Sequence, residues 1–375
     1  MTPRKILRFA LLPSLVTSAL LPAFGAEKAS PAPAASGAAQ VEHIRGGPAT
    51  PADLAEMAKL KELPPFTDKS GDGDFLLSQP LTPAPEQNPR PDVPKGKVVH
   101  FTLTAADSKF FPDTGLRGAT PTRDVSVYIP ANYVPGTPAP LLVSQDAMGG
   151  HNSSQLATIL DNMIADHRLP GIVAVMIRSG GGDDRGSARG LEYDTLSGKY
   201  AEFIEHEVLP RITRDYQVTF SQDPDARATM GGSSGGAASF TMAWFHPEWY
   251  HRVLTYTATY TDNQFPVNPA APHGAWEYHE HLIAQGPVKP LRVWLEVNEN
   301  DNGSDTTAAD RHNLVIANQR MAAALQAKGY HHQFVYTLGA GRFYAAGQGH
   351  DDAKAIARTL PRALEWLWQD YHPAK

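Results

Sequence analysis

Residues 230–236 are Met-Gly-Gly-Ser-Ser-Gly-Gly, and this segment is the most informative about the fold of the chain. A short strand pattern at 227–230 precedes them, and a run of small and apolar residues suited to a helix follows. A serine in so sharp a turn has a strained backbone, and only glycine neighbours let the following helix pack close beneath it. The segment therefore predicts an exposed, reactive serine between a buried strand and a helix.

The pattern G-x-S-x-G fits these residues in two registers. Ser233 is flanked by Gly231 and Gly235, whereas Ser234 is flanked by Gly232 and Gly236. A phosphate-binding turn is the main alternative, but the lysine that such a loop requires does not follow. The motif thus indicates a nucleophile without choosing between the two serines.

Working outward, the chain after Lys95 alternates strands and helices, which is typical of a mostly parallel sheet with helices on both faces. This pattern predicts an α/β fold. Strands are expected at 125–129, 141–143, 172–177, 227–230, 253–258, 292–297 and 333–336, and helices at 156–164, 200–208, 310–328 and 352–371.

The N-terminal part differs from the rest in composition. Three basic residues and a short apolar stretch lead to the small-residue pair Ala23 and Gly25, a pattern typical of a secretory signal peptide at 1–25. The apolar stretch is too short for a stable membrane anchor. Residues 26–95 are rich in Pro and Ala and are expected to form a linker and an N-terminal arm. The remaining residues, 96–375, are expected to form one catalytic domain, and the protein to be periplasmic or secreted.

Composition excludes several functions. The 375 residues carry a formal net charge of −6, so no basic surface for nucleic acid is expected. Cysteine is absent, so any covalent catalysis must use another nucleophile. The sequence has no H-E-x-x-H or comparable ligand spacing, and we expect neither a metal nor an organic cofactor.

A serine nucleophile needs a base and a carboxylate that orients the base. His350 lies in a Gly-rich loop between the last predicted strand and the final helix, where the base of such a fold is carried. The strand at 292–297 leads into Asp301, the favoured acid, with Glu299 and Asp305 as competitors. The predicted triad joins the serine of the elbow, Ser233 or Ser234, with Asp301 and His350.

An oxyanion hole needs two backbone N–H groups. We expect one from Ser234 and the second from Gln145 or Asp146, which follow the strand at 141–143. Trp276, on the long segment 261–290, and Arg185, on a Gly-rich loop, are candidate substrate contacts. For Trp276, the alternative is a segment that merely packs on the surface of the domain. For Arg185, the alternative is a solvated charged loop.

From about residue 98 to the end, the chain resembles the putative esterase family, which includes enterochelin esterases, feruloyl esterases and the S-formylglutathione hydrolase type. The resemblance depends on segments that include DVSVYIP at 124–130, LLVSQD at 141–146, EYD at 192–194, LPRI at 209–212, DARATMGGSSGG at 225–236 and GHD at 349–351. It implies an α/β-hydrolase fold, and the family pattern G-x-S-x-G-G makes Ser233 the nucleophile. The chain departs from many members in having Gln145, Asp146 and Ala147 where they carry a His-Gly pair.

The resemblance implies an exported serine esterase that works through an acyl-enzyme. Siderophore esters, hydroxycinnamoyl or acetyl esters of sugars, and aryl esters are the implied substrates. Small-molecule or carbohydrate-linked esters are therefore the expected partners. An acyltransferase that uses the same triad, or a catalytically silent binding protein with the same fold, are the alternatives.

Overall fold

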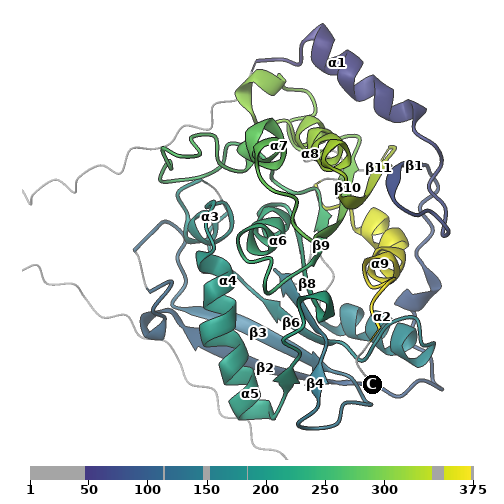
Figure 1. Ribbon diagram of the computed structural model, residues 1–375, viewed down its shortest axis with the longest axis vertical. Coiled ribbons are helices and arrows are strands. Elements are labelled where there is room, and N and C mark those ends of the chain that lie inside the picture. Colours follow the sequence, from purple (N-terminus) through teal and green to yellow (C-terminus); the bar gives the residue numbers. More distant parts are fainter. Residues whose placement is uncertain (1–46, 113–114, 147–152, 184, 340–349, 373–375) are drawn as a thin grey trace, which may run out of the picture. The chain divides into compact units, whose positions relative to one another are not determined.

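A nine-stranded sheet forms the centre of the structure (Figure 1), a computed structural model that describes residues 47–112, 115–146, 153–183, 185–339 and 350–372. The predicted signal peptide and residues 26–46 lie outside the described residues. The strand order is β1-β11-β10-β9-β8-β5-β6-β3-β2. The strands are β1 (Gly73–Leu77), β2 (Lys97–Thr104), β3 (Thr122–Ile129), β5 (Leu141–Gln145), β6 (Val173–Ile177), β8 (Arg227–Gly232), β9 (Arg252–Tyr256), β10 (Arg292–Asn298) and β11 (His331–Thr337).

The sheet is mostly parallel, as the alternating pattern predicts. Only the pairs β2 with β3 and β3 with β6 are antiparallel. A separate two-stranded sheet pairs β4 (Pro138–Ala139) with β7 (Thr219–Phe220). Every residue of the central strands β5, β6, β8 and β9 is buried, because helices cover both faces. This explains why these strands read as apolar runs without alternation.

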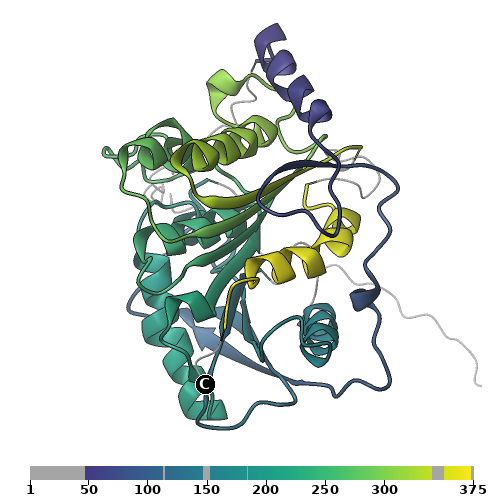
Figure 2. The same ribbon diagram turned by 45° about the vertical axis from the view of Figure 1, so that its right-hand side comes forward.

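Helices pack against the two faces of the sheet. Leu160 of α2 and Ile356 of α9 belong to one hydrophobic cluster, and Phe240 of α6 and Ile316 of α8 to the other. Figure 2 shows α2 and α9 together on one side of the strands. The helices are α1 (Pro51–Ala58), α2 (Ser153–Ala165), α3 (Ala188–Tyr193), α4 (Lys199–Phe203), α5 (Leu209–Tyr216), α6 (Ser234–Phe245), α7 (Ile283–Gln285), α8 (Leu314–Lys328) and α9 (Ala353–Leu367).

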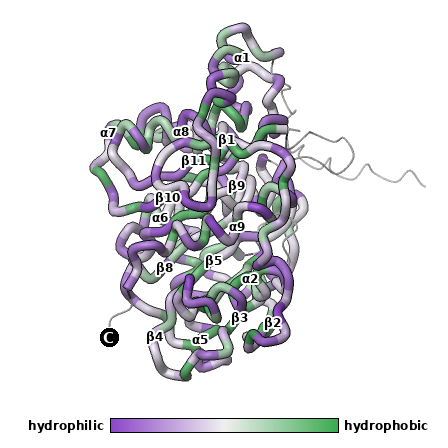
Figure 3. The backbone as a smooth tube through the Cα atoms, turned by 90° about the vertical axis from the view of Figure 1, so that its right-hand side faces the viewer, coloured by the Kyte–Doolittle hydropathy of each residue, from purple (hydrophilic) through white to green (hydrophobic). Residues whose placement is uncertain are grey.

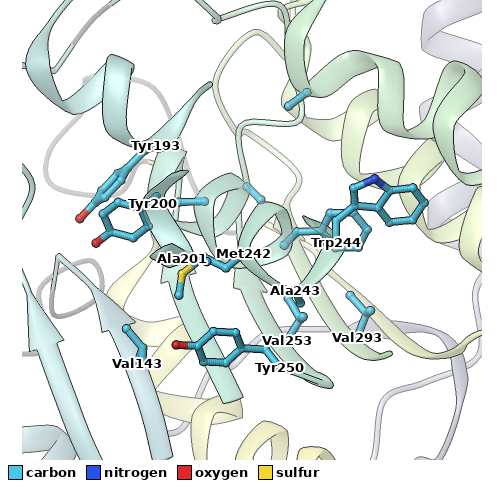
Figure 4. Close-up of a cluster of buried hydrophobic side chains, with 14 of the residues drawn as sticks. Val143, Tyr193, Tyr200, Ala201, Met242, Ala243, Trp244, Tyr250, Val253 and Val293 are labelled. Carbon is cyan, nitrogen blue, oxygen red and sulfur yellow. The ribbon is translucent and has the colours of Figure 1, made fainter. Parts of the chain in front are cut away.

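The core between α6 and the sheet is built from large side chains of several elements. Figure 4 shows Trp244 of α6, Tyr200 of α4, and Val253 and Val293 of neighbouring strands within this cluster. Along α9 the hydropathy alternates in Figure 3, as expected for a helix with one buried side. Within the described part of the chain, no helix is both long and apolar enough to span a bilayer.

The predicted boundary at residue 95 does not coincide with the edge of the sheet. Residues Gly73–Leu77 form β1, which pairs in parallel with β11 and extends the sheet at that edge. Residues 44–375 accordingly form one compact unit. The sequence gives little sign of this strand, because β1 is a five-residue edge strand with only its last residue fully buried. An edge strand exposed to solvent needs no apolar run.

The topology determines where a site can form. The parallel strands β5, β8, β9, β10 and β11 all end at the same edge of the sheet, where open α/β sheets carry their ligand sites. Asp146, Ser233, Thr257 and Asp301 each follow closely after one of these strand ends. The fold thus brings residues more than 150 positions apart to one edge.

Candidate active site

Ser233 occupies the sharp turn between β8 and α6. Its backbone angles are φ 54° and ψ −131°, in the left-handed half of conformational space that residues with a Cβ rarely adopt. A side chain on Gly231 would overlap the backbone of Gly235, which explains why glycine is required there. The strained turn presents Ser233 at the end of the strand, as a nucleophile elbow requires.

The geometry also distinguishes the two motif registers. Ser234 is the first residue of α6 and is only 4% exposed, and its hydroxyl donates to Asp194 Oδ2 at 3.2 Å. Ser233 is less buried and carries the strained conformation. This arrangement favours Ser233 as the nucleophile and gives the Ser234 side chain a structural role.

His350 and Asp301 lie in contact. The distance from His350 Nδ1 to Asp301 Oδ1 is 2.7 Å. The Asp301 side chain is fully buried and also accepts hydrogen bonds from the Asn302 and Asn298 amides at 2.8 and 3.3 Å. Since the carboxylate holds Nδ1, the other ring nitrogen is left for the nucleophile.

The two competing carboxylates are placed elsewhere. Glu299 Oε1 pairs with Lys61 at 2.6 Å, and its Oε2 accepts from the Gly339 amide at 2.8 Å. Asp305 contributes its carbonyl to the amide of Ala49. Of the three candidate acids, Asp301 is therefore the one whose carboxylate contacts His350 in the described part of the chain.

Ser233 and His350 are not hydrogen-bonded to each other in the described arrangement. His350 Nε2 is buried and has no partner among the described residues, while Ser233 Oγ lies 3.3 Å from Thr259 Oγ1. Burial opposes the charged imidazole, but the carboxylates of Asp351 and Asp301 outweigh it and raise the pKa of His350 to about 9. The described arrangement thus contains a histidine–aspartate pair and a strained serine at the same edge of the sheet.

The backbone N–H groups of Ser234 and Asp146, two predicted oxyanion donors, differ in their hydrogen bonding. Ser234 begins α6, so its N–H lies among the first amides of a helix, which have no intrahelical acceptor. The Asp146 N–H donates to the carbonyl of Ile177 at 2.8 Å and is not free in this arrangement. The structure therefore disfavours Asp146 as a donor.

Gln145 lies next to the elbow, but its side chain supports α6. Its Oε1 accepts from Ser239 at 2.8 Å, and its Nε2 lies 3.1 Å from the sulfur of Met242. Its Cβ would be 3.0 Å from a Cβ on Gly235, so the end of β5 packs tightly on the start of α6. A role for its backbone amide stays a prediction, and residues 147–152, including Ala147, lie outside the described part.

The charge of Asp146 is neutralised by its neighbours. Its Oδ2 is 2.9 Å from Arg189 Nε, and its Oδ1 accepts from Tyr193 and the Ser179 amide. The carboxylate is therefore compatible with a developing oxyanion near this loop, because Arg189 compensates it.

A cavity of about 570 Å³ lies beside the elbow. Each of its described lining residues is polar or a glycine, and both Asp351 and Gly232 belong to it. The remaining lining residues are Thr120, Thr122, Asp124, Asp146, Arg178, Ser179, Gly181, Gly182, Asp183 and Arg189. Such walls suit a hydroxylated or charged group better than a large apolar one.

Trp276, a candidate substrate contact, lies among the core residues. Its side chain is 2% exposed and packs in the core, edge-on to His279 and beneath the guanidinium of Arg320. Phe265, on the same segment, is 41% exposed and packs beside Gly186. The sequence could not separate a buried from an exposed aromatic on an irregular segment.

Arg185 lies where it was expected, on the Gly-rich loop, and half-buried. Its Nη2 is 3.9 Å from Asp262 Oδ1, and its carbonyl accepts from Arg117. Whether it contacts a substrate stays a prediction.

Several residues at the site escaped the sequence analysis. Thr257 and Thr259 follow β9, and Asp351 follows His350 directly. Asp194 is fully buried against Ser234 and Asn263, and burial raises its pKa to about 7. Threonines carry no motif, but the EYD and GHD segments already contain the two aspartates.

Comparison with known proteins gives a family match. Residues 120–362, well over half of the chain, match the family described as "Putative esterase". No curated protein sequence matches the chain.

Several solved structures share the fold. The enterobactin esterase from Shigella flexneri, in the presence of enterobactin, is 20% identical with a TM-score of 0.54, over 77% of this chain and 62% of that one. The feruloyl esterase module from Clostridium thermocellum, complexed with sinapinate, is 16% identical with a TM-score of 0.52, over 83% of this chain and 100% of that one. A ferulic acid esterase from Anaeromyces mucronatus is 14% identical with a TM-score of 0.52, over 76% of this chain and 96% of that one. This chain spans about three fifths of the length of the enterobactin esterases.

Proposed function

The chain belongs to the putative esterase family, and from this premise we propose that it is an exported serine esterase that hydrolyses a carboxylic ester through an acyl-enzyme. One observation carries the proposal: a strained serine at the end of β8 lies at the same sheet edge as a histidine held 2.7 Å from a buried aspartate.

The proposed reaction has two steps. Ser233 Oγ attacks the ester carbonyl while His350 Nε2 takes its proton, and the alcohol leaves with that proton. Water then attacks the acyl-enzyme with His350 again as base. Asp301 orients the imidazole and stabilises the imidazolium in both steps. For Ser233 Oγ to donate to Nε2, its hydroxyl must give up the contact with Thr259.

The oxyanion is proposed to form near the start of α6. The Ser234 N–H is one donor, and the positive end of the helix dipole adds to its effect. The second donor is proposed to come from the segment that follows β5.

The polar cavity supports a substrate class. Its described walls offer carboxylates, two arginines and hydroxyls, and no aromatic ring. We therefore favour an ester of a hydroxylated compound, such as an acylated sugar, over a purely aryl ester. Export is proposed from the basic residues, apolar stretch and small-residue pair within residues 1–25.

Hydrolysis of p-nitrophenyl acetate by the purified protein tests the proposal. Ser233→Ala is expected to lower turnover on the order of a millionfold, because the nucleophile is lost. Ser234→Ala is the matched control and is expected to keep most activity, since its hydroxyl contacts only Asp194. No turnover of short-chain esters, together with no labelling of Ser233 by a serine-directed phosphonate, would contradict the proposal.

A further inference from the structure

Asp351, the residue after His350, has an unusual backbone conformation and a side-chain contact across the sheet edge. Asp351 has φ 57°, and its half-buried carboxylate accepts a hydrogen bond from Thr257 Oγ1, with Oγ1 and Oδ1 2.6 Å apart. Thr257 has φ 43°, a conformation that a β-branched residue adopts only where its surroundings enforce it. Both residues therefore occupy costly conformations at the point where they meet.

The same carboxylate lies over the elbow. A Cβ on Gly232 would be 2.5 Å from Asp351 Oδ1 and 3.0 Å from Oδ2. The space that a side chain at position 232 would need is thus filled by Asp351. This gives a physical reason for glycine directly before Ser233.

Three segments meet at this carboxylate. Gly232 ends β8, Thr257 follows β9, and Asp351 precedes α9. The contact between them, which we call the Asp351 latch, joins the histidine segment to the nucleophile turn. His350 is the neighbour of Asp351 in the chain, so the latch restricts where the imidazole can lie.

We propose that Asp351 is a positioning residue, which anchors the His350 segment to the nucleophile elbow through its contacts with Thr257 and Gly232. The proposal rests on the proposed esterase function and adds to it a residue outside the Ser233, Asp301 and His350 triad.

The charges around the histidine agree with this role. Asp351 and Asp301 both favour the imidazolium, whereas burial and Arg189 oppose it. For Asp351 itself, burial favours the neutral acid, and His350 and the Thr257 hydroxyl favour the carboxylate. Because His350 and Asp351 stabilise each other's charged forms, removing the carboxylate must lower the pKa of His350.

The test compares four variants of the full mature protein. Asp351→Asn keeps the shape and removes the charge, and Thr257→Val removes the hydroxyl. Thr257→Ser restores that hydroxyl, and Asp352→Asn removes the charge of a neighbouring carboxylate that caps α9. Asparagine is also a good N-cap, so this control leaves the helix start intact. Two readouts are taken: the pH dependence of kcat/KM on p-nitrophenyl acetate, and the NMR titration of His350, assigned with His350→Gln.

The expected results are specific. Asp351→Asn lowers the pKa of His350 by about one to three, as seen in both readouts, whereas Asp352→Asn leaves it near the wild-type value. Thr257→Val lowers kcat/KM on the order of tenfold, and Thr257→Ser recovers most of the loss. If Asp351→Asn does not fold, the pair of Thr257 variants still decides the anchoring role.

Three outcomes overturn the proposal. The first is an unchanged His350 pKa in folded Asp351→Asn, and the second is an equal change in Asp352→Asn. The third is a kcat/KM of Thr257→Val that equals the wild-type value. A wild-type protein without esterase activity would contradict the proposed function alone, because the NMR titration tests the latch without turnover.

Discussion

The hydroxyl of Thr259 lies 3.3 Å from the hydroxyl of Ser233, and its backbone N–H donates to the Ser233 carbonyl at 3.1 Å. Thr259 thus contacts the nucleophile twice, once through its main chain and once through its side chain. Only the side-chain contact competes with His350 for the serine hydroxyl.

Replacing Thr259 with valine should therefore have a small effect. The backbone bond that supports the turn stays, and Ser233 Oγ is released toward His350. We expect kcat/KM for p-nitrophenyl acetate to change less than about tenfold, the range of one hydrogen bond. A loss of more than about a hundredfold would instead place Thr259 in the proton transfer.

Asp301 should be far more sensitive than its neighbour Glu299. Asp301→Asn keeps the size of the side chain but removes the charge that holds Nδ1–H of His350, so kcat should fall on the order of 10⁴-fold. Glu299→Gln alters a carboxylate that contacts Lys61 and Gly339, and should leave kcat nearly unchanged. Steady-state kinetics of both variants decide the assignment; equal losses would show that the loop, not the triad, was disturbed.

The pH dependence of activity should follow His350. Its pKa is raised to about 9, and only the neutral imidazole accepts the serine proton. We expect kcat/KM to rise about tenfold per pH unit below pH 9 and to level off above it. A profile with its acid limb near 6.5, the ordinary value for histidine, would contradict a His350 pKa raised by Asp351 and Asp301.

The raised pKa of His350 also makes the free energy of unfolding depend on pH. A histidine whose pKa is higher in the folded than in the unfolded protein stabilises the fold fully below about 6.5, and this contribution is lost as the pH rises to about 9. His350→Gln should lack this change, which amounts to roughly 3 kcal/mol at most. Denaturant unfolding of both proteins at pH 6 and pH 9 measures it.

The sequence predicts the sheet and the strained turn, and it selects the residues of the proposed triad, because each leaves a local pattern. Buried strands appear as apolar runs, the elbow needs its glycines, and Asp301 and His350 follow strands in the order that the fold requires. Sequence reasoning fails where the role of a residue depends on contacts that its neighbours in the sequence do not reveal. Asp146 follows β5 as an oxyanion donor should, but its N–H is bonded to Ile177. No local pattern marks Thr257 or Thr259, whose roles arise from contacts across the sheet edge.

Trp276 and Phe265 provide the clearest contrast between packing and binding. Trp276→Ala removes a core side chain and should lower the free energy of unfolding by about 3–5 kcal/mol. Phe265→Ala should leave stability almost unchanged. Its exposed ring lies against Gly186, on the loop that carries the cavity residues Gly182 and Asp183, so KM should rise roughly two- to tenfold. Unfolding curves and KM values for both variants test this; a raised KM for Trp276→Ala with normal stability would reverse the assignment.

The last prediction concerns the segment before residue 96. A protein that begins at residue 96 lacks β1, which pairs with β11 from Gly73 to Leu77, and also Phe66, which packs edge-on against Trp294. Removing them exposes the edge of β11 and part of a hydrophobic cluster, so this shortened protein should aggregate or unfold at a lower temperature. A protein that begins at residue 47 keeps both elements and should melt like a protein that begins at residue 26. Thermal unfolding followed by circular dichroism separates the cases, and equal melting temperatures for all three would restore the boundary at residue 95.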